Sequence, residues 1–406
     1  MRKPTGSAVA VIGAAYGDEG KGLMTDAFAA DLGGTDVTVV RFNGGAQAGH
    51  TVIAPDGRGH VFHHVGSGSF TGAGTYLSRF FVANPIVLHT ELADLARLGV
   101  QPKITCDPDT PITLPHDMMI NQIVERARGD ARHGSCGLGF GETIERGLNP
   151  EFALLASQLG DAAHVRELLQ RVVASWVPLR LARLGVTNLS AEDRALLASG
   201  TIMTQWLEDI AAFRDAVTIA QPKPIAGRVI FEGAQGLALD QDRGAFPYVT
   251  RSNTGVKNIL PLARAFGVAH LDIVYVTRAY TTRHGAGPLA HELPASPHAG
   301  IVDHTNVPNP WQGRLRFGTL DLDLLARSIC DDLSDIGTLP FTTAQALAMT
   351  CLDQVGTEVE YWQHQRLQVV QPGALAAAAA RLIGASGIFK SHGPSRAAIM
   401  RRTIEK

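Results

Sequence analysis

The stretch from Ala8 to Met24, AVAVIGAAYGDEGKGLM, joins a continuous apolar run to a glycine-rich turn and then to a helical pattern. A continuous apolar run is typical of a strand buried on both faces. A glycine-rich turn between a strand and a helix is typical of a loop that binds phosphate at the helix N-terminus. Asp18 and Glu19 nevertheless lie in the middle of this turn, where a phosphate would repel them. The stretch therefore predicts a phosphate-binding loop that also holds a metal ion or moves a proton.

The same alternation of apolar runs, polar or glycine-rich loops and helical patterns continues along the chain. We predict strands at residues 9–14, 37–42, 80–82, 229–231, 273–276 and 346–352. We predict helices at residues 23–32, 91–98, 165–182 and 320–333. This order indicates an α/β fold with a central, mainly parallel sheet flanked by helices. The sequence has no clear linker or repeat, so we expect a single large domain, residues 1–406, with elaborate active-site loops.

Composition and charge exclude several classes of protein. The chain has 406 residues and a net charge of −2, without a block of basic residues, so we expect no nucleic-acid partner. No uncharged apolar stretch reaches the about 18 residues that a membrane helix needs, so we expect no membrane partner. The four cysteines have no CxxC spacing, which indicates neither a zinc site nor a disulfide framework. We therefore expect a cytoplasmic protein.

Five unusual loops follow predicted strands. Ligands of open parallel sheets bind outside the carboxyl ends of the strands, which meet at one edge. We therefore expect a large composite active site at that edge. The five loops are YGDEGKG, NGGAQAGHT, FEGAQG, RAYTTRHGAGP and TCLD.

The first two loops carry residues that suit phosphoryl chemistry. Lys21 and backbone N–H groups can hold a phosphate, while Asp18 can hold Mg²⁺ or take a proton from a substrate beside that phosphate. His50, at the next strand end, can act as an acid or stabilise charge. A solvated turn and a structural histidine would give the same patterns, so these alternatives stay open.

The later loops carry hydrogen-bond donors and positive charge. Gln235 lies between two glycines, which allow a ligand to approach the backbone. Thr250 begins a run of hydroxyl and amide side chains that suits a phosphate ester. Arg314 and Arg316 alternate, so an extended backbone would point both guanidinium groups the same way to clamp a carboxylate. Ordinary turn chemistry and a surface arginine pair are the alternatives.

A candidate base-binding element lies near the C-terminal end. The TCLD motif ends a predicted strand and resembles the TKxD or NKxD element that binds guanine. Asp353 would then accept hydrogen bonds from the ring N–H and the exocyclic amine. The segment SHGPSR, residues 391–396, could close over the same base.

Between residues 9 and 396, these elements together resemble the adenylosuccinate synthetase family. Each motif is weak alone, but the ordered set is specific. The matching motifs are GDEGKG, NGGAQAGHT, FEGAQG, FPYVTRSNT, AYTTRHGAGP, GRLRFG, CLD and GPSR.

The resemblance implies a ligase of purine nucleotide biosynthesis that joins L-aspartate to C6 of a 6-oxopurine nucleotide. Asp18 would remove the N1 proton, and the 6-oxyanion would attack the γ-phosphate of GTP, releasing GDP. His50 would stabilise the transferred group, with Mg²⁺ held by Asp18 and the Gly49 carbonyl. The α-amino group of L-aspartate would then displace phosphate from C6.

The resemblance also assigns roles to other positions, and it implies a homodimer. The implied catalytic residues are Asp18, Lys21, His50 and Gln235. The implied substrate-binding residues are Gln47, Ser135, Cys136, Arg146, Thr250, Trp311, Gln312, Arg314 and Arg316. The implied GTP-binding residues are Gly17, Glu19, Gly20, Gly22, Thr51, Asp353, Ser391, Gly393 and Pro394.

The departures from the family's pattern lie among residues that set specificity. The segment 135–146 is shortened, and Arg146 is its match to an arginine that reaches into the partner subunit. The other departures are Ala46 and Gln47 in place of a His and an Asn near the purine, Cys136 in place of a phosphate-binding Thr, Trp311-Gln312 in place of a Thr-Thr pair, and Cys351 in place of a Lys that packs on guanine.

Three functions therefore stay open. IMP and GTP are the expected substrates, with adenylosuccinate as product. A paralogue could instead aminate GMP or dGMP to 2-aminoadenylosuccinate, with ATP as a possible donor, but phage-type paralogues of that kind tend to lose the loop aspartate that Asp18 retains. A GTP-binding regulatory protein would leave Gln235, Arg314 and His50 without roles, and the loop lacks the Ser or Thr that such proteins place on Mg²⁺.

Overall fold

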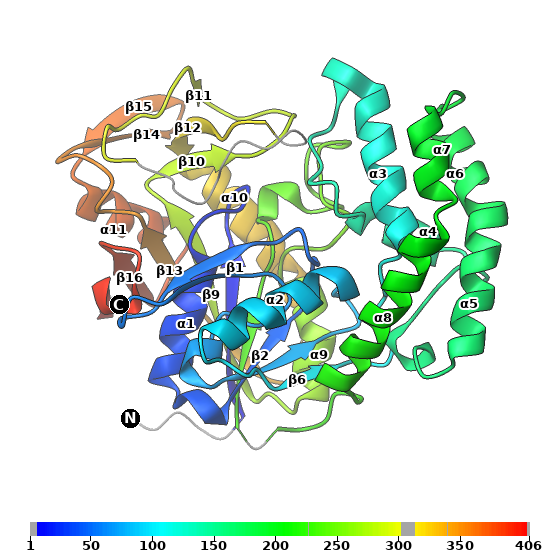
Figure 1. Ribbon diagram of the computed structural model, residues 1–406. Coiled ribbons are helices and arrows are strands. Elements are labelled where there is room, and N and C mark those ends of the chain that lie inside the picture. Colours follow the sequence, from blue (N-terminus) through cyan, green and yellow to red (C-terminus); the bar gives the residue numbers. More distant parts are fainter. Residues whose placement is uncertain (1–5, 226, 302–312, 339, 404–406) are drawn as a thin grey trace.

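A ten-stranded sheet crosses the molecule (Figure 1). The computed structural model describes residues 6–225, 227–301, 313–338 and 340–403. Neighbouring strands of the sheet are parallel, except that the edge strand runs antiparallel to its neighbour. In spatial order the strands are β17 (Ile399–Thr403), β16 (Gly387–Ser391), β13 (Thr342–Thr350), β9 (His270–Arg278), β1 (Ser7–Gly13), β8 (Arg228–Glu232), β2 (Val37–Arg41), β5 (Gly74–Leu77), β6 (Ile104–Cys106) and β7 (Val217–Ile219).

Helices cover both faces of this sheet, as the continuous apolar run in β1 predicts. Ala8, Ala10 and Ile12 pack in one buried cluster with residues of α9, α10 and α11. Val9 and Val11, which point the other way, pack in a second cluster with residues of α1. The helices are α1 (Lys21–Asp31), α2 (Pro85–Arg97), α3 (Pro115–Arg128), α4 (Phe140–Gly147), α5 (Ala162–Arg171), α6 (Val177–Arg183), α7 (Ala191–Leu197), α8 (Gly200–Ala216), α9 (Ile259–Ala265), α10 (Leu322–Leu333) and α11 (Pro372–Leu382).

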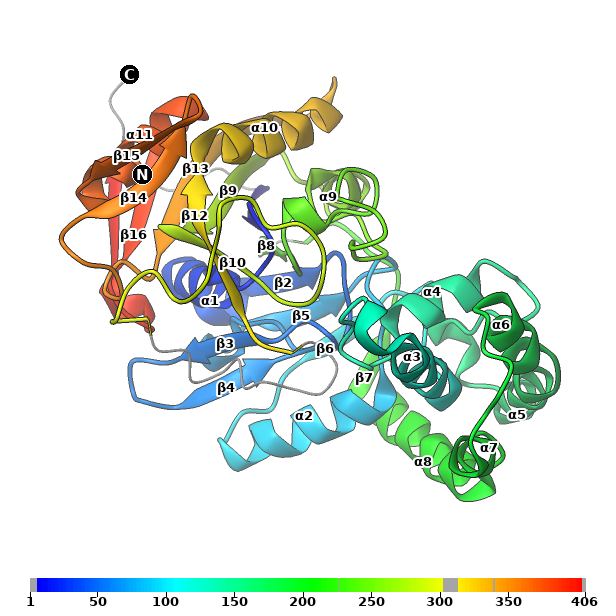
Figure 2. The ribbon, with the colours of Figure 1, turned by 90° about the horizontal axis from the view of Figure 1, so that it is seen from above.

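Helices α3 to α8 gather beyond the β7 edge of the sheet, on the side opposite α11 (Figure 2). The apolar faces of α3, α5, α6, α7 and α8 form a third buried cluster together with residues of β5, β6 and β7. A π-helical turn, Val172–Trp176, joins α5 to α6. The predicted helix at 165–182 is therefore confirmed in position, although a change of helical pitch interrupts it.

Two smaller sheets complete the fold. One contains β10 (Tyr280–Arg283), β12 (Arg316–Asp321), β14 (Val359–Gln363) and β15 (Arg366–Val370), with β11 (Glu292–Leu293) paired to β12. The other is a two-stranded ribbon of β3 (His50–Ile53) and β4 (Gly59–Phe62). Because β10 follows β9 almost directly, the five-stranded sheet lies beyond the carboxyl ends of the central strands (Figure 1).

The predicted fold class is confirmed, and one predicted strand is wrong. Residues 80–82 form a turn after β5, in which Val82 makes only an isolated bridge with Gly45. Phe81 and Val82 are apolar because they are buried, not because they belong to the sheet. Helix α2 begins six residues before its predicted start at 91, since Asn84 caps it and Pro85 occupies its first turn. Among the described residues, no helix has the length and apolar character needed to cross a membrane.

Candidate active site

The five loops singled out in the sequence do meet at one edge. Strands β13, β9, β1, β8 and β2 are consecutive neighbours in the sheet and all run parallel. Their carboxyl ends therefore lie side by side, and each is followed by one of the five loops. This is the edge at which open parallel sheets bind ligands.

The first loop delivers a helix N-terminus to this edge. Helix α1 begins at Lys21, and Gly20 precedes it in the left-handed conformation, with φ of 87° and no side-chain cap. The first turn of α1 contains no acidic residue. The backbone N–H groups of this turn and the helix dipole therefore favour an anion. Gly22 has no room for a side chain, since a Cβ would lie 2.9 Å from the Cβ of His50.

Glu19, one of the two acidic residues in the loop, has structural partners. Its buried carboxylate accepts hydrogen bonds from the N–H groups of Ala15 at 2.6 Å and Gly17 at 3.3 Å. Lys21 donates to the same carboxylate at 3.2 Å. A Cβ on Gly13 would lie 2.2 Å from a Glu19 oxygen, so this contact requires glycine there. Glu19 is thus an internal anion that holds the loop in shape.

Asp18 has the opposite environment, because its side chain is 30% exposed at the surface of the loop. Its oxygen Oδ2 lies 3.1 Å from Nε2 of His284, which comes from the loop after β10. Burial alone would raise the pKa of Asp18, but the hydrogen bond and charge of His284, together with Arg278 and Lys21, lower it. Asp18 is therefore ionised at neutral pH and can act as a base or as a metal ligand.

His50 rests on a buried pair of opposite charges. Its Nδ1 lies 2.7 Å from a carboxylate oxygen of Glu232, at the end of β8, and 2.9 Å from Nη1 of Arg41, at the end of β2. The second oxygen of Glu232 lies 3.0 Å from Arg41 and accepts the N–H of Ser67 at 3.1 Å. Both Arg41 and Glu232 are fully buried. The pair fixes the ring of His50 at the sheet edge.

Ionisation of this cluster follows from its burial. Burial lowers the pKa of His50 to about 4, against the opposing effect of Glu232. Burial would raise the pKa of Glu232, but the charges of Arg41 and His50 lower it to about 2. Glu232 is therefore ionised at neutral pH, while His50 is neutral until an anion beside it favours its protonated form. Glu232 and Arg41 were not predicted as site residues, although a charged residue at the end of each buried apolar run was a visible signal in the sequence.

The loop of Gln235 is tied to its neighbours by backbone contacts. The amide of Asn43, in the loop after β2, donates to the carbonyl of Ala234 at 3.0 Å and accepts its N–H at 2.7 Å. Gln235 itself has a positive φ of 62°. Within the described residues, the side-chain amide of Gln47 is buried and makes no hydrogen bond with either its nitrogen or its oxygen. Gln47 is therefore a polar group at this edge that the described part of the chain leaves unsatisfied.

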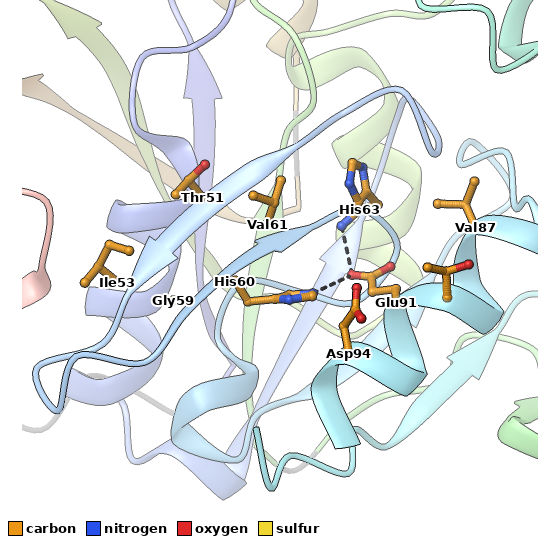
Figure 3. A pocket seen from close by; sticks show the side chains of 10 residues that line it. Thr51, Ile53, Gly59, His60, Val61, His63, Val87, Glu91 and Asp94 are labelled. Atoms are coloured by element: carbon orange, nitrogen blue, oxygen red, sulfur yellow. Dashed lines mark hydrogen bonds and ion pairs between the residues drawn. The ribbon is translucent and has the colours of Figure 1, made fainter. Parts of the chain in front are cut away.

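A chain of contacts supports the loop that carries Gln47 and His50. His63 donates its Nδ1–H to the carbonyls of Ala46 at 2.9 Å and Ala48 at 3.0 Å. Glu91 of α2 in turn accepts the N–H groups of His63 at 2.8 Å and His64 at 2.7 Å. Figure 3 shows Glu91 between the β3–β4 ribbon and α2, with His60 directed toward it.

The cavity in Figure 3 is distinct from the phosphate loop. It has a volume of about 500 Å³ and lies between the β3–β4 ribbon and α2. Of the predicted site residues, Thr51 lines it. The cavity therefore does not bring together the predicted catalytic residues.

The two predicted base-binding segments lie side by side, next to the phosphate loop. The N–H of Leu352 donates to the carbonyl of Ser391 at 3.0 Å, and the Ser391 hydroxyl donates to the carbonyl of Gly393 at 2.7 Å. The Thr350 hydroxyl donates to the carbonyl of Glu19 at 2.7 Å. Asp353 is exposed, as is Pro394. A nucleotide with its phosphates on the loop at residues 14–20 could thus extend its base toward these segments.

The segment from residue 133 to 139 packs against the loop after β10. Glu125 of α3 accepts the N–H groups of Gly134 at 2.8 Å and Ser135 at 3.3 Å, and Asn121 donates to the Ser135 hydroxyl at 2.7 Å. Burial raises the pKa of the Cys136 thiol to about 11. Cys136 is therefore a neutral thiol at neutral pH and not a reactive thiolate.

Arg146 does not reach outward, contrary to the role expected of it. Its guanidinium is 1% exposed and donates to Asp117 of α3 at 2.9 Å and to the carbonyl of Ile112 at 2.8 Å. The reason is local, since Arg146 lies on the inward face of α4 and neutralises a buried carboxylate. We therefore assign Arg146 a structural part.

The arginine pair also differs from its expected geometry. Arg314 lies at an exposed bend, and β12 begins only at Arg316, so the two side chains do not alternate along an extended strand. Arg316 pairs with Glu292 through two contacts, at 2.7 and 2.5 Å, and donates to the carbonyls of Gly285 and Gly287. Trp311 and Gln312 lie outside the described residues.

The loop around Thr250 is held mainly by two acids. Asp240 accepts the N–H of Thr254 at 2.7 Å, and Asp242 accepts the amide of Asn253 at 2.7 Å. The N–H of Thr250 donates to the carbonyl of Leu239 at 2.8 Å. Asn253 and Thr254 thus have structural partners, while Thr250 is half-buried at the loop surface.

Asp18 and Gly49 are the donors to consider for a metal ion at this edge. Among the described residues, no group of three or more His, Cys, Asp or Glu side chains is placed to hold a metal ion. Asp18 and the exposed Gly49 offer oxygen donors, the kind that Mg²⁺ prefers. Mg²⁺ usually takes few protein ligands and completes its shell with water and substrate phosphates, so this donor set suits it.

Comparison with known proteins places the chain in a family. A sequence profile of adenylosuccinate synthetase matches residues 10–375. The adenylosuccinate synthetase of Marinomonas sp. is 33% identical over 293 residues, which cover 71% of this chain and 65% of the relative. That of Acinetobacter baylyi is 32% identical over 344 residues, which cover 80% of this chain and 75% of the relative. The matched stretch thus spans somewhat under two thirds of the first relative and three quarters of the second.

Solved structures show the same fold at low sequence identity. A fully ligated adenylosuccinate synthetase from Plasmodium falciparum superposes with a TM-score of 0.73 at 18% identity, covering 98% of this chain and 100% of that one. The cyanophage S-2L succinoaminodeoxyadenylate synthetase PurZ, bound to dGMP and dATP, gives a TM-score of 0.60 at 15% identity, covering 98% of this chain and 95% of that one. Because the family profile matches residues 10–375 and the Acinetobacter baylyi relative is 32% identical over 80% of this chain, the chain belongs to the adenylosuccinate synthetase family.

Proposed function

We propose that this protein is a ligase that joins L-aspartate to C6 of IMP and hydrolyses GTP to GDP and phosphate. One observation carries the proposal. The ionised Asp18, the phosphate loop of Lys21 and the His50–Glu232 pair lie at the ends of neighbouring parallel strands. A base, an anion site and a charge stabiliser at one edge suit a reaction that removes a proton and transfers a phosphoryl group.

The residues at this edge divide the work. Asp18 accepts the N1 proton of the purine, which makes the 6-oxygen a nucleophile toward the γ-phosphate. The helix α1 N-terminus and Lys21 hold the phosphates, and His50 stabilises the charge on the group in transfer. Its low pKa suits this task, because the approaching phosphate favours the protonated ring, which can then donate to it.

Mg²⁺ fits the same edge through Asp18 and the carbonyl of Gly49. When bound, it neutralises phosphate charge and orients the triphosphate. The amide of Gln235 contacts the 6-position, and Thr250 contacts the 5′-phosphate. Arg314 and Arg316 bind the carboxylates of L-aspartate, and Asp353 binds the base of the donor. We also propose that the protein acts as a homodimer.

A second substrate choice has specific support. Gln47 replaces the family's usual residue near the purine, and its amide has no hydrogen-bond partner within the described residues. One structural neighbour, PurZ, is bound to dGMP with dATP as energy donor. A paralogue that aminates GMP or dGMP is therefore the alternative, whereas the retained Asp18 favours IMP.

Phosphate release from the purified protein tests the proposal. The assay contains Mg²⁺ and L-aspartate and combines IMP, GMP or dGMP with GTP or ATP. We expect release with IMP and GTP that depends on L-aspartate. Preferred turnover of GMP or dGMP would move the assignment to the alternative, and release without any need for aspartate would point to a GTP-binding regulatory protein. No release in any combination would contradict a ligase.

A further inference from the structure

We propose that His284 is a positioning residue that holds the carboxylate of Asp18 in its reactive orientation, an inference that rests on the proposed function. Nε2 of His284 lies 3.1 Å from Oδ2 of Asp18. The two residues are 266 positions apart in the sequence, and they meet because the loops after β1 and β10 lie at the same sheet edge. Within the described part of the chain, this is the ion pair that Asp18 makes.

The backbone that follows His284 is held firmly, which gives the imidazole a defined direction. Arg316 donates to the carbonyls of Gly285 at 3.0 Å and Gly287 at 2.9 Å. Arg283 donates to the carbonyl of Ala286 through two nitrogens, at 3.1 and 2.8 Å. A Cβ on Gly134 would lie 2.7 Å from the Cα of Gly285, so the segment before Ser135 packs closely against this loop. The backbone next to His284 is thus held by Arg316, by Arg283 and by the close packing of Gly134.

Asp18, by contrast, lies on a strained and partly exposed turn. Its φ of 57° is in the left-handed region, which a non-glycine residue adopts at some cost. Its side chain is 30% exposed, so packing alone does not fix its torsions. The contact with His284 commits Oδ2 and leaves Oδ1 for the substrate or Mg²⁺. A base held in one orientation reacts faster, since a misplacement of about 1 Å can reduce a rate about 100-fold.

The side-chain geometry suggests matched variants. H284Q retains an N–H donor near the position of Nε2, whereas H284L removes it and keeps much of the volume. H89L is the control, because His89 makes a comparable 3.0 Å pair with Asp209 that links α2 to α8. Neither His89 nor Asp209 belongs to the predicted site.

The test measures kcat and KM for each substrate in these variants, with thermal unfolding as the check on folding. It also measures positional isotope exchange in the nucleoside triphosphate without L-aspartate, which reports the phosphoryl-transfer step alone. We expect H284L to lower kcat and the exchange rate together, by about 10- to 100-fold. The KM values should stay within a small factor, H284Q should recover most of the rate, and H89L should match the wild type.

Several results would overturn the inference. A kcat for H284L equal to that of H89L would show that the contact is dispensable. A fall in kcat with unchanged isotope exchange would place His284 in the aspartate step instead. Equal losses in H284Q and H284L with a lower melting temperature would indicate a structural role. A wild-type protein without turnover would remove the proposed function, and this inference with it.

Discussion

The loops at the sheet edge and the loops beyond it differ in how their charges are neutralised. At the edge, Glu19 and Glu232 are buried, and each is paired with a cation and with backbone N–H groups. Beyond the edge, Arg314 is exposed, and the pair of Arg316 and Glu292 has side-chain exposures of 27% and 42%. The first set is part of the core, while the second is partly in water.

This difference in burial sets the consequence of a substitution. Removing one partner of a buried pair leaves an uncompensated charge and costs about 3–5 kcal/mol, whereas an exposed pair contributes about 0.2–1 kcal/mol. The residues proposed for phosphoryl transfer therefore depend on buried ion pairs, and substitutions in those pairs should lower the stability of the protein strongly. The less buried residues proposed to bind aspartate can vary at a smaller cost in stability.

The largest effect should come from Asp18, where the two regions meet. We expect D18N to lower kcat at least about 1000-fold, because an amide can neither accept the N1 proton nor supply a charged oxygen to Mg²⁺. Its melting temperature should change little, since the side chain is partly exposed. Steady-state phosphate release and thermal unfolding check both statements, and a D18N protein with near-normal turnover would remove Asp18 from the mechanism.

The next largest effect should come from Glu232, beneath His50. We expect E232Q to lower the free energy of unfolding by about 3 kcal/mol, because it leaves Arg41 buried without its counter-charge. Urea unfolding at pH 7 measures this loss. E292Q is the matched control beyond the edge, where the same change should cost less than about 1 kcal/mol. Equal losses in E232Q and E292Q would show that burial does not set the cost of removing one charge of a pair in this protein.

The sequence predicted the sheet edge well because strand ends are a local property. Apolar runs located the five central strands, and glycine-rich loops after them located Asp18, Lys21 and His50. The pairing of Glu232 with Arg41, and of His284 with Asp18, escaped prediction because these partners are far apart in the chain and come together only through the sheet order. The single-domain assignment stays a prediction.

The differences from the expected geometry have the same origin. Residues 80–82 are apolar because they fill the core from a turn, and an apolar pattern does not distinguish that from a strand. Arg146 was assigned from a motif alone, but the side of α4 on which it lies turns it toward Asp117. Arg314 and Arg316 were assigned from alternation, which holds only where the backbone is extended, and a bend precedes β12.

A third prediction concerns Asp332, a buried carboxylate whose nearest cation lies farther away than the arginine that pairs with Glu232. Asp332 of α10 accepts the N–H of Val256 at 2.9 Å and the hydroxyl of Tyr275 at 2.8 Å, while Arg243 lies 3.8 Å away. Burial outweighs these contacts and raises the pKa of Asp332 from 3.8 to about 6. The direction is opposite to that of Glu232, which has a cation in close contact.

The sign of the pH dependence follows from this shift. A carboxyl whose pKa is raised by folding binds its proton more tightly in the folded state, so its contribution to stability is present at low pH. That contribution is lost as the pH rises through about 4 to 6. We expect the wild type to gain about 1.4 kcal/mol relative to D332N between pH 8 and pH 5. Urea unfolding of both proteins at the two pH values measures it, and a difference independent of pH would contradict it.

The smallest effect should come from Gln47 and Cys136, two uncharged residues proposed to lie near the purine. Gln47 and Cys136 carry no charge at neutral pH, and replacing them breaks no ion pair. We expect Q47N and C136T, which restore the family's usual residues, to change the ratio of kcat/KM for IMP over GMP by about fivefold each, about 1 kcal/mol. The free energy of unfolding should stay within about 1 kcal/mol of the wild type, since both changes are small in volume.

The direction of the change in the ratio of kcat/KM for IMP over GMP shows which purine Gln47 and Cys136 favour. An increase in the preference for IMP would mean that Gln47 and Cys136 shape the purine site in favour of GMP. A decrease would mean that they already favour IMP. An unchanged ratio in both variants, and in the double variant, would show that these residues do not contact the purine. In that case, other residues would have to determine the choice of purine.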